Sequence, residues 1–291
     1  MPRMLKRGLP ASQSATLADR LDCSPTPAKL WSVFVAVGRG TLKKIVDWIF
    51  TIPFLITFGL TLAVFEPIAR VARLFGLRPM EVTMGVMQRI LLVVFRIGGT
   101  SLRVDRSPLV LPSTAYILVS NHQSLFDIPI FGGLLFSNYP KYVSKRELGR
   151  WLPSISFNLT HGGNALIDRG DPVQARQAIR ELAVTSAARD VAVVIFPEGT
   201  RSRDGRLKPF RTGGLKELLD AAPDLPVIPT TVDGAWKLLR NNLFPVPFGT
   251  TVRVRFSDPL ARNVGEDYEE LIARARDVIE GTLLEWRAID V

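Results

Sequence analysis

Cysteine and histidine are scarce in this chain. Among its 291 residues there is one cysteine, Cys23, and there are two histidines, His122 and His161. A single cysteine excludes an internal disulfide and a metal site made of several thiolates, and two histidines argue against a zinc site rich in imidazole. Cys23 lies in a polar N-terminal stretch, which argues against a catalytic thiol. We therefore expect no metal site built on several thiolates or imidazoles.

Acidic residues are outnumbered by basic ones. The chain has 37 Lys and Arg against 27 Asp and Glu, a formal net charge of +10 at pH 7. Such an excess predicts a polyanionic partner, which could be nucleic acid, an anionic lipid surface or an acidic protein. Residues 1–46 carry eight basic residues against two acidic ones, and a long apolar run follows. Because anionic headgroups attract basic segments beside an apolar anchor, an anionic membrane surface is the favoured partner.

The apolar run covers residues 48–65, which are 18 residues without a charge. This is near the lower limit for a membrane-spanning helix, and Pro53 would kink it. A second apolar stretch, residues 84–98, is interrupted by Arg89 and Arg96 and is more typical of an interfacial amphipathic helix.

Basic residues flank the first run on both sides, so the positive-inside rule gives no orientation. We expect a helical hairpin that enters one leaflet and returns, with both flanks on the cytoplasmic side of the membrane. The alternative is a buried helix pair of a soluble domain.

The character of the chain changes twice along its length. Residues 1–29 mix basic residues with Pro, Ser, Ala and Thr and lack the apolar stretch of a secretory signal, so we expect a mobile basic tail. Residues 30–98 are expected to form the membrane-associated helices. From residue 99 to residue 291, strand and helix patterns alternate, which predicts an α/β domain with a mixed sheet flanked by helices.

Short apolar or β-branched runs mark the expected strands, which are residues 101–104, 115–120, 164–167, 191–196, 227–231 and 251–256. Longer amphipathic patterns mark the expected helices, which are residues 172–186, 213–222 and 267–286.

A polar cluster follows the apolar run at residues 116–119. From Asn121 to Asp127 the chain reads Asn-His-Gln-Ser-Leu-Phe-Asp, so His122 should lie where a strand ends and a helix begins, the place where open α/β sheets bind ligands. An imidazole can take a proton near neutral pH, and a carboxylate on its other nitrogen fixes the tautomer. Positions i and i+5 of a helix point about 140° apart, so pairing requires His122 in the turn and Asp127 in the first helical turn. The alternative is a helix cap followed by an exposed first-turn acid.

A second polar cluster follows the expected strand at residues 191–196. Arg201 offers a fork of donors suited to a phosphate, Gly199 lets the backbone approach closely, and Thr200 adds a hydroxyl. The cluster continues with further cations, which are Arg203, Arg206, Lys208 and Arg211. The alternative is a solvated basic loop.

Together these segments resemble the 1-acylglycerol-3-phosphate acyltransferase family, the PlsC-like lysophospholipid acyltransferases. Residues 121–127 match its NHxxxxD motif and residues 196–202 match its FPEGTRS motif. Between them, residues 145–148 fit a KxEL segment and residues 167–169 fit an IDR segment. The chain departs from the family at residues 156–157, Ser-Phe, where glycine is usual, so the acyl or acceptor channel can differ.

The resemblance implies an α/β fold of the glycerolipid acyltransferase type and a fatty acyl transfer that needs no metal and no resident cofactor. The donor would be acyl-CoA or acyl carrier protein, and the acceptor a lysophospholipid, foremost 1-acyl-sn-glycerol 3-phosphate, giving phosphatidic acid. His122 would be the general base, Asp127 its orienting acid, and Lys145 the cation that stabilises the oxyanion. The resemblance assigns acceptor binding to Asn121, Arg169, Glu198, Gly199, Thr200 and Arg201.

Other functions remain alternatives from the sequence alone. Within the same chemistry, the acceptor could be glycerol 3-phosphate, another lysophospholipid or a lyso-aminolipid. A basic nucleic-acid-binding protein would interleave aromatic with basic residues, whereas the aromatics here gather in apolar runs, so we expect no nucleic-acid partner. A serine hydrolase acting on lipids would need a G-x-S-x-G elbow, which the sequence lacks.

Overall fold

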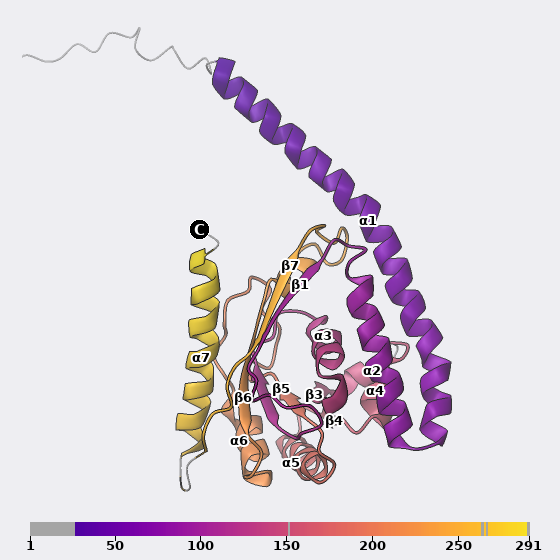
Figure 1. The fold of residues 1–291 in the computed structure, drawn as a ribbon, viewed down its shortest axis with the longest axis vertical. Coiled ribbons are helices and arrows are strands. Elements are labelled where there is room, and N and C mark those ends of the chain that lie inside the picture. The colour runs from indigo at the N-terminus through magenta and orange to yellow at the C-terminus, as the bar shows by residue number, and fades with distance from the viewer. Residues whose placement is uncertain (1–26, 151, 263–264, 266, 290–291) are drawn as a thin grey trace, which may run out of the picture. The chain divides into compact units, whose positions relative to one another are not determined.

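The computed structural model describes residues 27–289 except 151, 263, 264 and 266. The chain divides into two units, Met1–Ile45 and Val46–Val291, and the second unit holds the sheet and the candidate site residues (Figure 1). The tail expected over residues 1–29 lies outside the described residues up to residue 26, and helix α1 begins at Pro27.

The apolar stretches form two long helices. α1 is Pro27–Leu74, with Pro53 and Pro67 inside it, and α2 is Leu77–Val94. Gly76 lies between them at φ 120°, a conformation that favours glycine, and the chain turns back there so that α2 runs antiparallel to the end of α1 (Figure 1). Residues Gly40–Leu74 are long and apolar enough to cross a membrane by length and composition. The predicted helical hairpin is confirmed, whereas its relation to a bilayer stays a prediction.

The hairpin buries one face and exposes another. On the buried face, Leu62 and Ala69 of α1 pack with Met80, Met84 and Leu91 of α2. The exposed side chains on the second unit's part of the hairpin include an apolar series at roughly helical spacing, namely Ile49, Ile52, Ile56, Leu60, Val64, Ile68, Val71, Val82, Val86, Ile90 and Val93. We call this series the apolar stripe. A contiguous exposed apolar surface marks an interaction site.

A seven-stranded sheet with the order β1-β7-β6-β2-β5-β3-β4 forms the centre of the second unit. Its strands are β1 (Ser101–Arg106), β2 (Ile117–Ser120), β3 (Lys141–Lys145), β4 (Ala165–Ile167), β5 (Val193–Ile195), β6 (Val227–Asp233) and β7 (Thr251–Phe256). β6 and β7 pair antiparallel and the other neighbours pair parallel, which confirms the predicted mixed α/β class. The six expected strands are present, with ends shifted by up to two residues; β3 was not expected, because lysines interrupt its apolar pattern.

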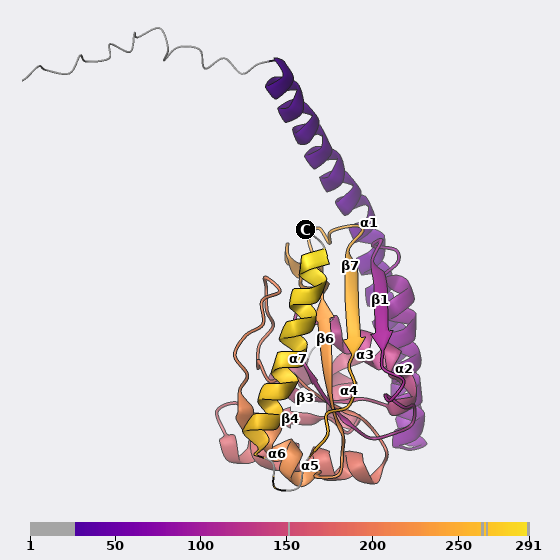
Figure 2. The same ribbon diagram turned by 60° about the vertical axis from the view of Figure 1, so that its left-hand side comes forward.

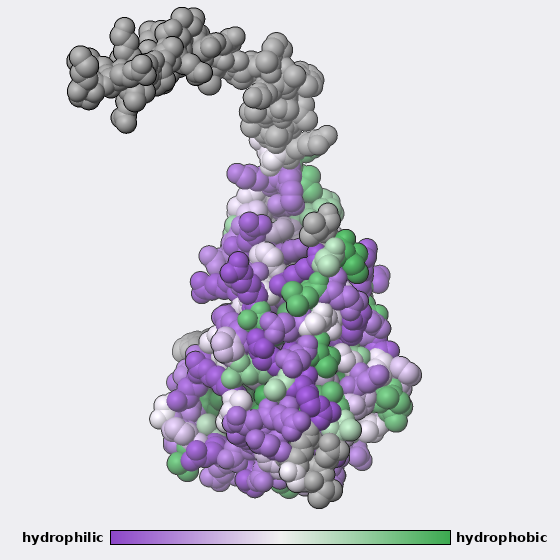
Figure 3. Space-filling model, turned by 90° about the vertical axis from the view of Figure 1, so that its left-hand side faces the viewer, coloured by the Kyte–Doolittle hydropathy of each residue, from purple (hydrophilic) through white to green (hydrophobic). Residues whose placement is uncertain are grey.

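Helices cover both faces of the sheet. They are α3 (Asp127–Leu134), α4 (Ile155–His161), α5 (Pro172–Ala188), α6 (Thr212–Ala221) and α7 (Tyr268–Ile289), with 3₁₀ turns at Phe136–Asn138, Arg146–Gly149 and Ala235–Leu239. Helices α5, α6 and α7 pack on one face, and α3 with the hairpin packs on the other (Figure 2). Hydrophilic side chains cover much of the surface on the α7 side (Figure 3). The expected helices are present, and α4 was not expected.

Strand β2 shows how the core is divided. Ile117 and Val119 belong to the apolar cluster under α5, α6 and α7, whereas Tyr116 and Leu118 belong to the cluster under α3 and the hairpin. A parallel strand buried on both faces is a continuous apolar run without alternation, which is why β2 could be recognised but its two faces could not.

A buried ion cluster fastens α2 to the rest of the second unit. The carboxylate of Glu81 on α2 lies 2.5 Å from Nζ of Lys141 on β3 and 2.9 Å from Nη2 of Arg189, which follows α5. The side chains of Glu81 and Lys141 are only 2% and 5% exposed. Burial lowers the pKa of Lys141 to about 8, although the charge of Glu81 opposes the shift. Each charge therefore depends on the other, since removing one leaves a buried charge without its partner.

Glu81→Gln is expected to lower the free energy of unfolding at pH 7 by about 3–5 kcal/mol, because Lys141 loses its buried carboxylate partner. Chemical denaturation in detergent, followed by tryptophan fluorescence, measures the change. Glu269→Gln is the matched control, since the Glu269 side chain is 62% exposed in its ion pair with Lys216 and such pairs contribute about 0–1 kcal/mol. Equal losses in the two variants would contradict the proposed fastening.

Candidate active site

His122 and Asp127 lie where β2 meets α3. β2 ends at Ser120 and α3 begins at Asp127, so the histidine is in the turn and the aspartate in the first helical turn, as their pairing requires. Nδ1 of His122 lies 2.8 Å from Oδ2 of Asp127. Because Asp127 occupies Nδ1, Nε2 is the ring nitrogen left to accept a proton from a ligand.

Asp127 is fully buried and orients the turn as well as the imidazole. The same oxygen, Oδ2, also accepts hydrogen bonds from the backbone N–H of Gln123 at 2.8 Å and of Ser124 at 2.9 Å. The N-terminus of a helix favours a negative charge, and hydrogen bonds to a carboxylate are strong. The carboxylate is therefore fixed in one orientation and fixes its partners in turn.

The imidazole of His122 rests on an aromatic ring. Its centroid lies 4.1 Å from that of Phe196 with an interplanar angle of 20°, and Phe131 stacks on the same phenylalanine at 6.1 Å. The His122 side chain is 18% exposed, so part of it remains open to solvent. This leaves a restricted approach for a ligand.

The second motif holds the backbone of His122. Its N–H donates to Oε1 of Glu198 at 2.7 Å, and its carbonyl accepts from the N–H of Ser202 at 2.7 Å. Oε2 of Glu198 accepts from the N–H of Lys208 at 3.0 Å. Burial raises the pKa of the Glu198 carboxyl, although these hydrogen bonds oppose the shift. Both oxygens of Glu198 are thus used inside the protein: Oε1 joins the two loops, and Oε2 binds the backbone of its own loop.

Two arginines flank Gly199. The residue has φ +67°, which favours glycine, and a Cβ there would lie 3.3 Å from Cδ of Arg211. Its carbonyl accepts a hydrogen bond from Nη2 of Arg169. Burial, and after it the charge of Arg211, lower the pKa of Arg169. An anion bound beside the two guanidinium groups would relieve their repulsion.

The outer part of this loop is exposed. Thr200 and Arg201 face solvent, and Nζ of Lys208 donates to the carbonyl of Arg201 at 2.7 Å and to Oγ1 of Thr200 at 3.3 Å. Within the described part of the chain, the guanidinium of Arg201 makes no hydrogen bond or ion pair, so its donors are available to a ligand. From the sequence, Lys208 was only one member of a basic run. Its hydrogen bonds to Thr200 and Arg201 could not be predicted.

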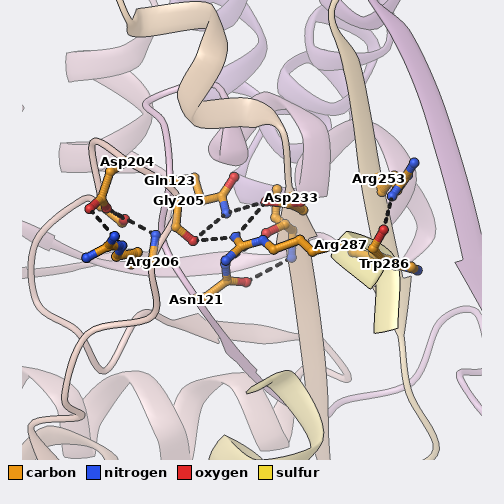
Figure 4. Close-up of polar contacts among 11 residues, drawn as sticks. Asn121, Gln123, Asp204, Gly205, Arg206, Asp233, Arg253, Trp286 and Arg287 are labelled. Carbon is orange, nitrogen blue, oxygen red and sulfur yellow. Dashed lines mark hydrogen bonds and ion pairs between the residues drawn. The ribbon is translucent and has the colours of Figure 1, made fainter. Parts of the chain in front are cut away.

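Asn121 is held inside the fold. Its Nδ2 donates to the carbonyl of Val232 and its Oδ1 accepts from the N–H of Val232, both at 2.8 Å (Figure 4). Asn121 is buried, and both polar groups of its side chain join β2 to β6. The resemblance assigns acceptor binding to Asn121, but its side-chain amide is already hydrogen-bonded to the backbone of Val232.

Lys145 lies at the same edge of the sheet as His122 but not beside it. Lys141 and Ile117 are both level with Val193, so Lys145 is level with Asn121. β5 lies between β3 and β2, which separates the two strands by about 10 Å. The exposed Lys145 side chain is at the edge where the motifs meet, and its role in stabilising an oxyanion stays a prediction.

Ser156 and Phe157, where the chain departs from the family, make structural contacts. Phe157 joins the hairpin cluster and lies under the guanidinium of Arg70, 4.6 Å from the ring centroid. Oγ of Ser156 donates to the carbonyl of Leu148 at 3.2 Å and accepts from the N–H of Leu152 at 3.0 Å. These two residues connect α4 to both the hairpin and the KxEL segment.

Comparison with known proteins finds a family model and several relatives that match part of this chain. The model of the acyltransferase family matches residues 102–233. The 1-acyl-sn-glycerol-3-phosphate acyltransferase of Cocos nucifera is 31% identical over 164 residues, covering 54% of this chain and 49% of that protein. The human 1-acyl-sn-glycerol-3-phosphate acyltransferase alpha is 32% identical over 146 residues, 50% of each chain. The chain spans about half the length of these relatives.

A solved structure shows the same fold. The 1-acyl-sn-glycerophosphate (LPA) acyltransferase PlsC from Thermotoga maritima matches with a TM-score of 0.69 at 22% identity, over 84% of this chain and 98% of that one. The family match contains both motifs, at residues 121–127 and 196–202. The resemblance found in the sequence is confirmed: residues 102–233 match the model of the acyltransferase family.

Proposed function

We propose that this protein transfers a fatty acyl group from an acyl thioester to the free hydroxyl of a lysophospholipid. The observation that carries the proposal is the 2.8 Å contact between Nδ1 of His122 and Asp127, on a turn whose backbone is held by Glu198. The names of the matched relatives support 1-acyl-sn-glycerol 3-phosphate as the acceptor and phosphatidic acid as the product. The donor, acyl-CoA or acyl carrier protein, is a co-substrate.

The reaction needs one proton acceptor and one site for negative charge. Nε2 of His122 removes the proton of the acceptor hydroxyl as its oxygen attacks the thioester carbonyl, and Asp127 stabilises the imidazolium that forms. The oxyanion of the tetrahedral intermediate is assigned to Lys145, a positive charge where negative charge develops. When the intermediate collapses, the ester forms, the carbon–sulfur bond breaks, and the imidazolium returns its proton to the leaving thiolate.

The acceptor phosphate is assigned to the cations of the second motif. Arg201 has available donors, and the guanidinium groups of Arg169 and Arg211 flank Gly199 at the base of the same loop. Guanidinium groups bind phosphate oxygens in a bidentate manner. The loop is joined to the His122 turn through Glu198 and Ser202, so phosphate binding and proton abstraction occur on one framework.

The apolar stripe is assigned to one leaflet of the inner membrane, on the cytoplasmic side. The turn of the hairpin carries Arg70, Arg73 and Arg78. Because charged side chains are costly at the centre of a bilayer, such a tip favours a position at the headgroups. A hairpin that lies along the interface would keep the site within reach of a lysophospholipid that stays in the membrane.

His122→Ala is expected to lower the rate of acyl transfer by about 10²–10⁴, the loss typical of removing a general base. The assay supplies acyl-CoA or acyl carrier protein with a panel of lysolipids in detergent or vesicles. His161→Ala is the matched control, because this exposed histidine packs on Phe157 away from the two motifs. If the wild-type protein acylates no acceptor, the proposed function fails; full activity in His122→Ala would refute the role of the base.

Arg201→Ala is expected to raise the apparent KM for 1-acylglycerol 3-phosphate about tenfold or more, because a charge-assisted hydrogen bond is lost. Monoacylglycerol, an acceptor without phosphate, should be affected little. Arg206→Ala removes the same charge from the same loop and serves as control, since Arg206 pairs with Asp204 at the surface. An equal loss with both acceptors would indicate a structural role for Arg201.

Cysteine labelling tests the position of the hairpin. In a Cys23→Ser background, Lys44→Cys and Leu109→Cys place one thiol before and one thiol after the apolar part of the hairpin. Both are expected to react with an impermeant maleimide only from the cytoplasmic side, because a hairpin in one leaflet returns the chain to the side it came from. Labelling of the two positions from opposite sides would establish a complete crossing.

A further inference from the structure

Four polar groups meet beside the turn that carries His122. Nε2 of Gln123 donates to Oδ1 of Asp233 at 3.1 Å and, more weakly, to the carbonyl of Gly205 at 3.5 Å. Nη2 of Arg287 donates to the same two acceptors, at 3.1 Å and 2.6 Å respectively. Figure 4 shows these groups pointing toward one another. We call Gln123, Gly205, Asp233 and Arg287 the Arg287 square.

The square joins segments that are far apart in the sequence. Gln123 follows the histidine of the first motif, Gly205 lies just beyond the second motif, and Asp233 is the last residue of β6. Arg287 belongs to α7 and lies outside residues 102–233, the part matched by the family model. The helix thus supplies one donor to a network whose other members are within the family domain.

The acceptors of the square are fixed in place. Gly205 is buried at φ +78°, and a Cβ there would lie 2.4 Å from Nε1 of Trp236, so its backbone is packed against that ring. The side chain of Asp233 is 11% exposed and that of Arg287 is 38% exposed. A carboxylate that is largely out of water needs a partner, and Arg287 supplies the positive charge.

Gln123 connects the square to the catalytic pair. Its side chain belongs to the square, whereas its N–H donates to Oδ2 of Asp127, the oxygen that also contacts His122. A shift of Gln123 would therefore move a donor of Asp127 and the peptide group next to the imidazole. Misplacing reacting groups by about 1 Å can cost about 10² in rate.

Helix α7 is fastened to the sheet by other contacts. Arg255 on β7 pairs with Glu285 at 2.6 Å and with Asp105 on β1 at 2.8 Å. Arg253 donates to the carbonyl of Trp286 at 3.1 Å (Figure 4). Buried apolar side chains on the same helix, Ile279, Leu283 and Trp286, add to this docking. The docking of α7 therefore does not rest on the contacts of Arg287 with Asp233 and Gly205 alone.

We propose that Arg287 is a positioning residue for His122, acting through Asp233, Gly205 and Gln123. It touches no substrate; it holds the Gln123 side chain so that the backbone of this residue presents its N–H to Asp127. The inference rests on the proposed acyl transfer, and it makes the C-terminal helix α7 part of the framework of the site.

Arg287→Gln in the acyl-transfer assay is expected to lower kcat about tenfold or more, because His122 loses its fixed position. The apparent KM of donor and acceptor should stay unchanged, since no binding group is altered. Arg287→Lys keeps a cationic donor and should recover part of kcat. Arg255→Gln removes a docking contact of the same helix and should leave kcat unchanged. An equal kcat in Arg287→Gln and Arg255→Gln would overturn the proposal.

The route through Gln123 has its own test. Gln123→Met removes the side-chain amide and keeps the backbone N–H that donates to Asp127. In this background, Arg287→Gln should have little further effect on kcat, because the connection is already cut. Independent sites give additive effects, so additive losses in the double variant would refute this route.

A measurement without turnover separates this inference from the proposed function. ¹⁵N-histidine labelling gives signals from His122 and His161 only, because the chain has two histidines. Arg287→Gln is expected to shift or broaden the His122 signals and leave those of His161 unchanged, and Arg255→Gln should change neither. Asp233→Asn, which removes the charge from the same network, replaces Arg287→Gln if that variant does not fold.

The outcomes are distinct. Unchanged His122 signals in the folded Arg287→Gln or Asp233→Asn protein would overturn the positioning role. A wild-type protein that transfers no acyl group, but whose His122 signals respond to the loss of Arg287, would refute the proposed function and keep the inference.

Discussion

The site depends on one oxygen atom, Oδ2 of Asp127. It accepts hydrogen bonds from Nδ1 of His122 and from the backbone N–H groups of Gln123 and Ser124. Because the carboxylate is buried in the first turn of α3, water does not compete for these donors. The same atom therefore sets the shape of the turn, the tautomer of the imidazole and the direction of Nε2.

The second motif supports this arrangement from the neighbouring strand. β5 pairs with β2, so the loops that follow the two strands leave the same edge of the sheet. Glu198 and Ser202 bind the N–H and the carbonyl of His122. The loop thus has an inner part that holds the catalytic turn and an outer part, with Arg201, that offers its donors to solvent. The proposed proton abstraction and the proposed phosphate binding would thus use different side chains of one framework.

Polar and aromatic contacts, made by residues outside the apolar stripe, hold the hairpin on the same domain. Glu81 places a buried carboxylate between Lys141 and Arg189, and Phe157 packs into the hairpin cluster beneath Arg70. A surface of the kind that binds lipid therefore belongs, from Val46 onward, to the same compact unit as the sheet that carries the site. The Phe157 position shows how a departure from a family motif can serve this attachment.

The sequence by itself determined the two motifs, the hairpin, six strands and the mixed α/β class, because apolar periodicity, turn residues and motif spacing are properties of neighbours along the chain. It missed β3, since Lys141 is buried only through a carboxylate on a distant helix. It also assigned Asn121 to the acceptor, whereas the folded chain pairs this amide with Val232. Only the tertiary structure decided such partners, and with them the contacts of Arg287, because a buried polar group is satisfied by whatever residue folding brings beside it.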